Sequence, residues 1–195
     1  MGPPADGPPD PARRAVVDAE EVSVFRGRVL EVRNDRVRLA DGTRATCEIV
    51  VHPGGALTIP VLDDGRLVLE RQFRYAVGCA MLEFPAGRLD AGETALAAAQ
   101  RELAEETGYT ARDWTHLMTL HPTIGYSTER IELFLAERLT LAAARPEPME
   151  SIEVVVFSED ELLAAFDRGE FSDGKSVAAL FALQRLRARR AVLPR

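Results

Sequence analysis

The fold of this 195-residue chain is constrained most by the order in which strand-like and helix-like hydrophobic patterns follow one another. From residue 21 to 52, Val, Leu, Ile and Phe alternate with polar residues, which is the period of strands. Residues 94–107 then show a helical pattern that ends at Gly108, because glycine adopts a left-handed C-cap without strain. Strand patterns follow at 114–122, 129–139 and 152–158, and helical patterns at 159–169 and 172–190. This order predicts an α/β (α+β) sandwich with mixed sheets rather than a parallel βαβ array.

Short turn signals divide the first strand region. Asn34-Asp35 and Asp41-Gly42 lie between apolar runs, and their side chains tolerate the positive φ of tight turns. They predict a three-stranded antiparallel meander within residues 21–52. Asp63-Asp64-Gly65 has the same character and predicts a hairpin in the segment that follows.

Composition and periodicity divide the chain into three parts. A Pro-rich, polar and disordered tail is predicted at residues 1–20, an N-terminal antiparallel β-sheet element at 21–55 and the main domain at 56–195. With 46% hydrophobic residues, the chain is expected to be globular. Its two cysteines are expected as core residues in a reducing cytoplasm.

The charge and the apolar runs exclude two classes of partner. The chain has 31 Asp and Glu against 24 Lys and Arg, a formal net charge of -7, which repels a phosphate backbone and argues against nucleic acid. No segment reaches the roughly 20 apolar residues of a membrane span, so no membrane association is expected.

Three glutamates lie close together on the helix predicted at residues 94–107. At about 100° per residue, Glu102 and Glu106 lie about 40° apart and Glu105 about 60° to the other side, next to an apolar stripe. Carboxylates crowded beside a core repel one another unless a cation neutralises them. An all-oxygen ligand set suits Mg²⁺ or Mn²⁺, although a solvated acidic helix surface would show the same pattern.

The flanking residues favour the metal site. Residues 87–109 read GRLDAGETALAAAQRELAEETGY and match the pattern G-x5-E-x7-R-E-U-x-E-E-x-G-U at every defined position. This stretch resembles the box of the Nudix hydrolases. The resemblance implies an α/β/α sandwich that holds Mg²⁺, with Mn²⁺ as an alternative, and hydrolyses a nucleoside diphosphate linked to another moiety.

The resemblance also implies roles for individual residues. Metal ligands would be Glu102 and Glu106, assisted by Glu105, and the backbone carbonyl of Ala86. Gly87, Glu93 and Arg101 would shape and orient this cluster.

Segments outside the box are similar to the ADP-ribose pyrophosphatase branch, so the likeness covers residues 21–186. These segments are LERQFRY, LEFPAGRLDAGE, HPTIGYSTERIELFLAERL and FSDGKSVAALFALQRL. The likeness implies cleavage of ADP-ribose to AMP and ribose 5-phosphate. It also implies a homodimer in which the N-terminal sheet packs onto the partner's catalytic domain.

The same likeness suggests substrate-binding residues and a base. Arg74, Glu83 and Glu129 would contact phosphates, ribose or adenine. The water-activating base would come from the loop RPEPMESIEV, where Glu150, as base or metal ligand, fits the register best and Glu147 is next.

Other functions stay open at this point. Ile124 stands where the branch commonly has proline, and Tyr126 where Nudix hydrolases of diadenosine polyphosphates carry tyrosine. Other nucleoside diphosphate sugars, including GDP-mannose, are alternative substrates. A housecleaning hydrolase of nucleoside triphosphates and a non-catalytic module that binds nucleotide sugars are the alternative functions.

Overall fold

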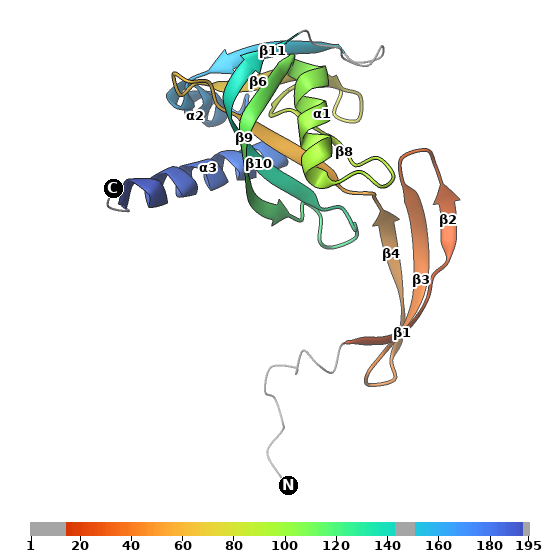
Figure 1. Cartoon of the computed structure of the whole chain (residues 1–195). Helices are drawn as coiled ribbons and strands as arrows, with labels where there is room; N and C mark the ends of the chain where they lie inside the picture. The colour runs from red at the N-terminus through yellow and green to blue at the C-terminus, as the bar shows by residue number, and fades with distance from the viewer. Residues whose placement is uncertain (1–14, 143–150, 193–195) are drawn as a thin grey trace. The chain divides into compact units, whose positions relative to one another are not determined.

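The structure is a computed structural model that describes residues 15–142 and 151–192 (Figure 1). The described residues form two compact units. The first contains residues 15–53 and 123–129, and the second contains residues 54–122 and 130–192. This division differs from the predicted segments 21–55 and 56–195, because the loop at 123–129 joins the N-terminal residues.

The first unit is an antiparallel sheet built around one long strand. Its strands are β1 (Val16–Glu20), β2 (Ser23–Arg26), β3 (Glu31–Leu39) and β4 (Arg44–Val51). Both β1 and β2 pair with β3 on one side, and β4 pairs with it on the other. Strand β1 corrects the expected end of the disordered tail at residue 20, because residues 16–20 pair in register with residues 36–39.

The turn predicted at Asn34-Asp35 is wrong. These residues continue β3, and the reversal occurs instead near Gly27, whose N–H donates to the Leu30 carbonyl at 2.9 Å. Asp35 is buried, and its carboxylate accepts hydrogen bonds from the Val22 N–H at 3.1 Å and the Arg33 guanidinium at 2.8 Å. These bonds satisfy a side chain that would otherwise favour a turn. The turn predicted at Asp41-Gly42 is confirmed, with Gly42 at φ 85°.

The second unit contains two further sheets. One has the order β8 (Ala86–Arg88), β5 (Gly55–Pro60), β10 (Ile131–Leu141) and β9 (Tyr109–Leu120). The other has the order β11 (Ile152–Phe157), β6 (Leu67–Arg74) and β7 (Cys79–Glu83). Only β5 and β10 run parallel, so the predicted mixed sheets are confirmed within the described residues.

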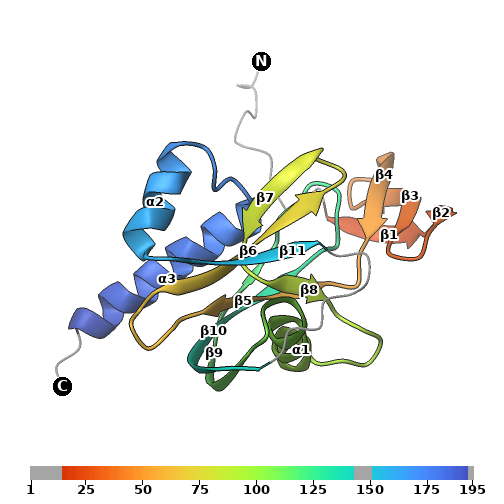
Figure 2. The same ribbon diagram turned by 90° about the horizontal axis from the view of Figure 1, so that it is seen from above.

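The alternation of side chains along β5 separates two cores. Leu57 and Ile59 face a large apolar cluster shared with β6, β10 and the C-terminal helices α2 (Glu159–Asp167) and α3 (Gly174–Val192). Ala56 faces the opposite side, where it packs with Ala98 and Ala99 of helix α1 (Ala95–Thr107). The first sheet of this unit therefore lies between α1 and the remaining layers (Figure 2).

Helix α1 begins and ends as predicted. Thr94 is its N-cap and accepts a hydrogen bond from the Ala97 N–H at 3.2 Å, and Gly108 closes it at φ 72°. Its buried apolar stripe contains Ala98, Ala99 and Leu103, whereas Leu96 is 39% exposed. Asp173 caps α3, since its carboxylate accepts from the Ser176 N–H at 3.1 Å.

Two other local expectations change. The turn at Asp63-Asp64-Gly65 is present, with Gly65 at φ 88°, but β5 and β6 diverge into different sheets after the single bridge between Val61 and Leu67. Cys79 is exposed rather than buried in the core, because it lies at the start of edge strand β7.

Substitution of Asp35 tests the corrected turn. We expect Asp35→Ala to destabilise the first unit by about 2 kcal/mol, because the Val22 N–H and the Arg33 guanidinium lose their buried acceptor. Hydrogen exchange of peptides from residues 16–51 measures the change. Asn34→Ala, at an exposed position of the same strand, is the control. Equal protection in both variants would contradict the assigned role of Asp35.

Candidate active site

The residues of the glutamate helix converge with β8 and the end of β6 on one polar cavity. Its volume is about 270 Å³. It is lined by Arg74, Ala86, Gly87, Arg88, Asp90, Arg101, Glu102 and Glu106. Positions separated by up to 32 residues in the sequence therefore share one site.

Glu106 is the most deeply buried of the three glutamates, with 4% of the residue exposed. Its Oε2 accepts a hydrogen bond from the Ala86 N–H at 3.0 Å. This bond fixes the Glu106 carboxylate beside the backbone of the strand that leads into the box, where the Ala86 carbonyl is the predicted additional ligand.

Gly87 provides the space that Glu102 occupies. A Cβ built at Gly87 would lie 1.8 Å from Glu102 Oε1 and 1.9 Å from its Cδ, so every residue with a side chain would displace the carboxylate. The requirement for glycine here is a close approach and not a positive φ. The predicted role of Gly87 in shaping the cluster thus has a direct steric basis.

Arg101 connects the loop before α1 to the acidic face of the helix. Its Nε and Nη2 donate to the two oxygens of Glu93 at 3.0 and 2.9 Å, and its Nη2 also donates to the Arg88 carbonyl at 3.0 Å. Its Nη1 donates to Glu102 at 2.7 Å and to Glu105 at 3.2 Å. The hydrogen bonds from Arg101 hold the pKa of Glu93 below its ordinary value, and those to Glu93 raise the pKa of Arg101.

A second ion pair, at Arg74 and the buried Glu83, adjoins the cavity. Glu83, whose side chain is 2% exposed, accepts from Arg74 Nε at 2.7 Å and Nη2 at 2.8 Å, and it also pairs with Lys175. Burial tends to raise the pKa of Glu83, but the hydrogen bonds from Arg74 and the charge of Lys175 outweigh burial and lower it. Glu83 therefore stays ionised and holds the Arg74 guanidinium at the cavity.

Comparison with known families decides the identity of this site. The NUDIX domain model matches residues 51–180, which include the complete box and both ion pairs. The chain belongs to the NUDIX family. ADP-ribose pyrophosphatase of Bacillus subtilis (strain 168) is 34% identical over 163 residues, which span 83% of this chain and 88% of that protein. Methanol dehydrogenase activator of Bacillus methanolicus is 32% identical over the same shares of the two chains.

A solved structure supports the fold of this NUDIX protein. The crystal structure of an ADP compounds hydrolase superposes with a TM-score of 0.79 at 24% identity. The match covers 93% of this chain and 97% of that chain. Among the residues that the structure describes, no helix is long and apolar enough to cross a membrane.

The structure brings together most of the residues predicted for the NUDIX site. Arg74, Ala86, Gly87, Arg101, Glu102 and Glu106 line the cavity, and Glu83 and Glu93 contact two of them. Glu105 pairs with Arg101, but its side chain is 41% exposed, which sets it apart from Glu102 at 15%.

The remaining three predicted residues are Glu129, Glu147 and Glu150. Glu129 lies in the first unit, where its carboxylate is 3.7 Å from His52 Nδ1. Glu147 and Glu150 lie outside the described residues, so their assignment stays a prediction.

Sequence reasoning missed Arg88, Asp90 and Lys175. Arg88 and Asp90 occupy variable positions of the box pattern and were not considered as cavity residues. Lys175 carries a signal that could have been used, because a cation in the first turn of a helix opposes the helix dipole.

The residues present fit a hard divalent cation whose coordination shell is completed by oxygens from other molecules. Within residues 15–142 and 151–192, no three His, Cys, Asp or Glu side chains gather as a cage. Mg²⁺ is commonly held by one or two carboxylates together with phosphate and water oxygens. Glu102, Glu106 and the Ala86 carbonyl could supply such a partial set, and the Glu102 carboxylate occupies the space that a side chain at position 87 would fill.

Gly87→Ala tests this arrangement. We expect Mn²⁺ affinity to fall about tenfold or more, because the new methyl group would occupy the place of the Glu102 carboxylate. Isothermal titration with MnCl₂ measures the affinity. Gly174→Ala is the control, since nothing lies within 4 Å of a Cβ there. Unchanged binding in Gly87→Ala would show that Glu102 is not a ligand.

Proposed function

We propose that this protein hydrolyses the pyrophosphate bond of ADP-ribose in a Mg²⁺-dependent reaction that yields AMP and ribose 5-phosphate. The observation that carries the proposal is the polar cavity that Glu102 and Glu106 line together with Arg74. Carboxylates beside a guanidinium suit a cation and a diphosphate that bind together. A relative that is 34% identical over most of both chains is an ADP-ribose pyrophosphatase, which supports this substrate.

In this proposal the residues of the chain position the substrate. Arg74 binds Glu83 through Nε and Nη2, and its Nη1 would donate a hydrogen bond to a phosphate or ribose oxygen. Glu102, Glu106 and the Ala86 carbonyl would hold the cation, Glu105 would assist, and Arg101 and Glu93 fix the helix against the loop. The bound cation would neutralise the diphosphate oxygens and lower the pKa of the attacking water.

Hydrolysis also requires a group that accepts the proton of water. The water oxygen bonds to one phosphorus, the bridging phosphorus–oxygen bond breaks, and the leaving phosphate takes the released electron pair. We assign the proton acceptor to Glu150, with Glu147 as the second candidate, from the likeness to the ADP-ribose pyrophosphatase branch. Glu83 and Glu129 were predicted to contact ribose or adenine, and the ion pair of Glu83 instead favours a role through Arg74.

Three other features of the protein are proposals. A homodimer through the N-terminal sheet would cover exposed apolar side chains of the first unit, namely Val16, Val17, Val24 and Phe25. The use of Mg²⁺ rather than Mn²⁺ is inferred from the family resemblance, and a cytoplasmic location from the small number of cysteines.

A substrate panel tests the proposed function. With Mg²⁺, we expect ADP-ribose to be cleaved faster than GDP-mannose, diadenosine polyphosphates and nucleoside triphosphates, measured as phosphate released after added phosphatase. Glu106→Gln should lower kcat/KM about a thousandfold, because it removes a ligand charge at a buried position. Glu137→Gln, at a half-buried glutamate that pairs with Arg190 and does not line the cavity, is the matched control.

The outcomes of the panel separate the candidate functions. Release of pyrophosphate from a triphosphate with no cleavage of ADP-ribose would favour a housecleaning hydrolase. Binding of ADP-ribose without any hydrolysis would favour a non-catalytic module.

Comparison of two variants identifies the base. We expect Glu150→Gln to lower kcat for ADP-ribose about a hundredfold or more with little change in KM, because a base acts in the chemical step. Glu147→Gln should keep most of the activity. Single-turnover and steady-state rates measure both variants, and the reverse order would assign the base to Glu147.

A further inference from the structure

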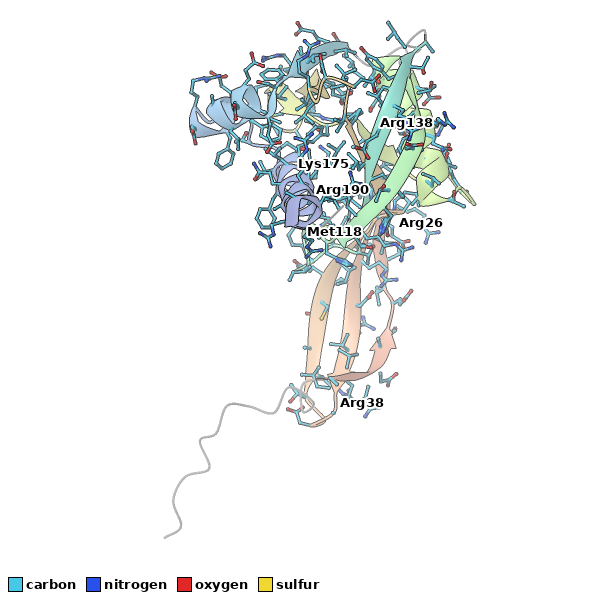
Figure 3. The ribbon with its side chains drawn as sticks, turned by 60° about the vertical axis from the view of Figure 1, so that its left-hand side comes forward. Arg26, Arg38, Met118, Arg138, Lys175 and Arg190 are labelled. Atoms are coloured by element: carbon cyan, nitrogen blue, oxygen red, sulfur yellow. The ribbon has the colours of Figure 1, made fainter. Side chains whose placement is uncertain are left out.

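The first turn of the C-terminal helix carries a cation that contacts the Glu83–Arg74 ion pair beside the proposed site. The chain contains 24 Lys and Arg residues, and Lys175 is the only lysine among them. Figure 3 labels it at the beginning of helix α3. The other 23 are arginines. The contacts of the Lys175 ammonium group therefore indicate why this position has a lysine.

Lys175 lies between two carboxylates and is mostly buried. Its side chain is 18% exposed, and its Nζ pairs with Glu83 Oε2 and donates to Asp173 Oδ2 at 2.8 Å. Asp173 is the N-cap of α3 and also accepts from Ser176 Oγ at 2.6 Å. The Phe84 N–H donates to Ser176 Oγ at 2.9 Å. The first turn of α3 is thus joined at two neighbouring residues to the segment that leads from β7 to Ala86.

The position of Lys175 is electrostatically unfavourable without these anions. The N-terminal turn of a helix carries a partial positive charge, which disfavours a cation there. Glu83 and Asp173 compensate for that charge. An ammonium group is compact and donates in three directions, whereas a guanidinium is a broad planar fork, so lysine suits a place between two close carboxylates.

Lys175 acts on Arg74 through the shared carboxylate. Arg74, Lys175, Glu83 and Asp173 form a group of two cations and two carboxylates, so their formal charges balance. Glu83 Oε2 accepts from both Arg74 Nη2 and Lys175 Nζ, so the contact with Lys175 helps to fix the orientation of the carboxylate to which the Arg74 guanidinium is bound. The Arg74 guanidinium is thereby oriented at the cavity that it lines.

We propose that Lys175 is a positioning residue for the diphosphate site, acting on Arg74 through Glu83 without touching the substrate. The proposal rests on the proposed function, because it gives Arg74 a diphosphate to bind. It also assigns the first turn of the C-terminal helix to the substrate site. Lys175 is not among the residues that line the cavity, so its effect should depend on Arg74.

A double-mutant cycle tests that dependence. We expect Lys175→Met, which keeps the length of the side chain without its charge, to raise KM for ADP-ribose about tenfold with a much smaller change in kcat. In an Arg74→Met background the same substitution should have no further effect on KM. Arg185→Met, which removes an exposed cation from the same helix, is the control and should leave KM unchanged. Thermal unfolding of each variant monitors the fold, and Lys175→Gln replaces Lys175→Met if that variant does not fold.

Three results of the cycle would overturn the proposal. They are an unchanged KM in Lys175→Met, an equal rise in KM with and without Arg74, and an equal effect of Arg185→Met. The first two results would mean that Lys175 does not act through Arg74. The third would mean that the loss of any cation from the helix has the same effect on KM.

A spectroscopic measurement tests the coupling without turnover. Because the chain has one lysine, protein labelled with ¹³Cε-lysine gives one lysine resonance. We expect Arg74→Met to shift that resonance, since Lys175 would become the sole cation on Glu83, and Arg185→Met to leave it in place. An unmoved resonance in Arg74→Met would overturn the proposal even if ADP-ribose is hydrolysed. If wild-type protein does not cleave ADP-ribose, the proposed function fails, and this resonance still decides whether Lys175 and Arg74 are coupled.

Discussion

The ionic contacts of Arg101 are the interaction on which the site depends. Helix α1 carries three glutamates within five positions, and their mutual repulsion would otherwise turn them apart. One guanidinium, with 29% of its side chain exposed, joins Glu93, Glu102 and Glu105 and also holds the Arg88 carbonyl. The loop that follows β8 is therefore fixed to the helix by these charged contacts as well as by the packing of Leu89 against Ala98 and Ala99. Glu102 and Glu106 at the same time line the cavity.

Much of helix α1 could be predicted because its signals are local. Thr94 and Gly108 lie at the ends that their capping chemistry requires, and the box spacing identifies the residues that meet Arg101. The strand pattern after the box was also sufficient to predict β9, β10 and β11. In each case the deciding interactions involve residues close in the sequence or a strict period.

Long-range contacts explain what the sequence did not reveal. Asn34-Asp35 has turn chemistry, but a buried contact of Asp35 with the Val22 N–H, 13 residues away, retains it in a strand. The two ends of the β5–β6 turn enter different sheets because β5 finds a parallel partner in β10, more than 70 residues later. Glu83 and Lys175 are separated by 92 residues, and no local pattern pairs them. The sequence therefore suggested Arg74 and Glu83 only as separate candidates and not as an ion pair with Lys175.

The loop at residues 123–129 limits how the two units can be separated or exchanged between proteins. It belongs to the first unit, where Val50 exchanges backbone hydrogen bonds with Tyr126 and Thr128, yet it interrupts the second unit between β9 and β10. The chain crosses from one unit to the other three times, and no single cut separates them. The N-terminal sheet therefore cannot be transferred as one continuous segment. A graft of residues 15–53 onto another catalytic domain would also need the matching segment at 123–129.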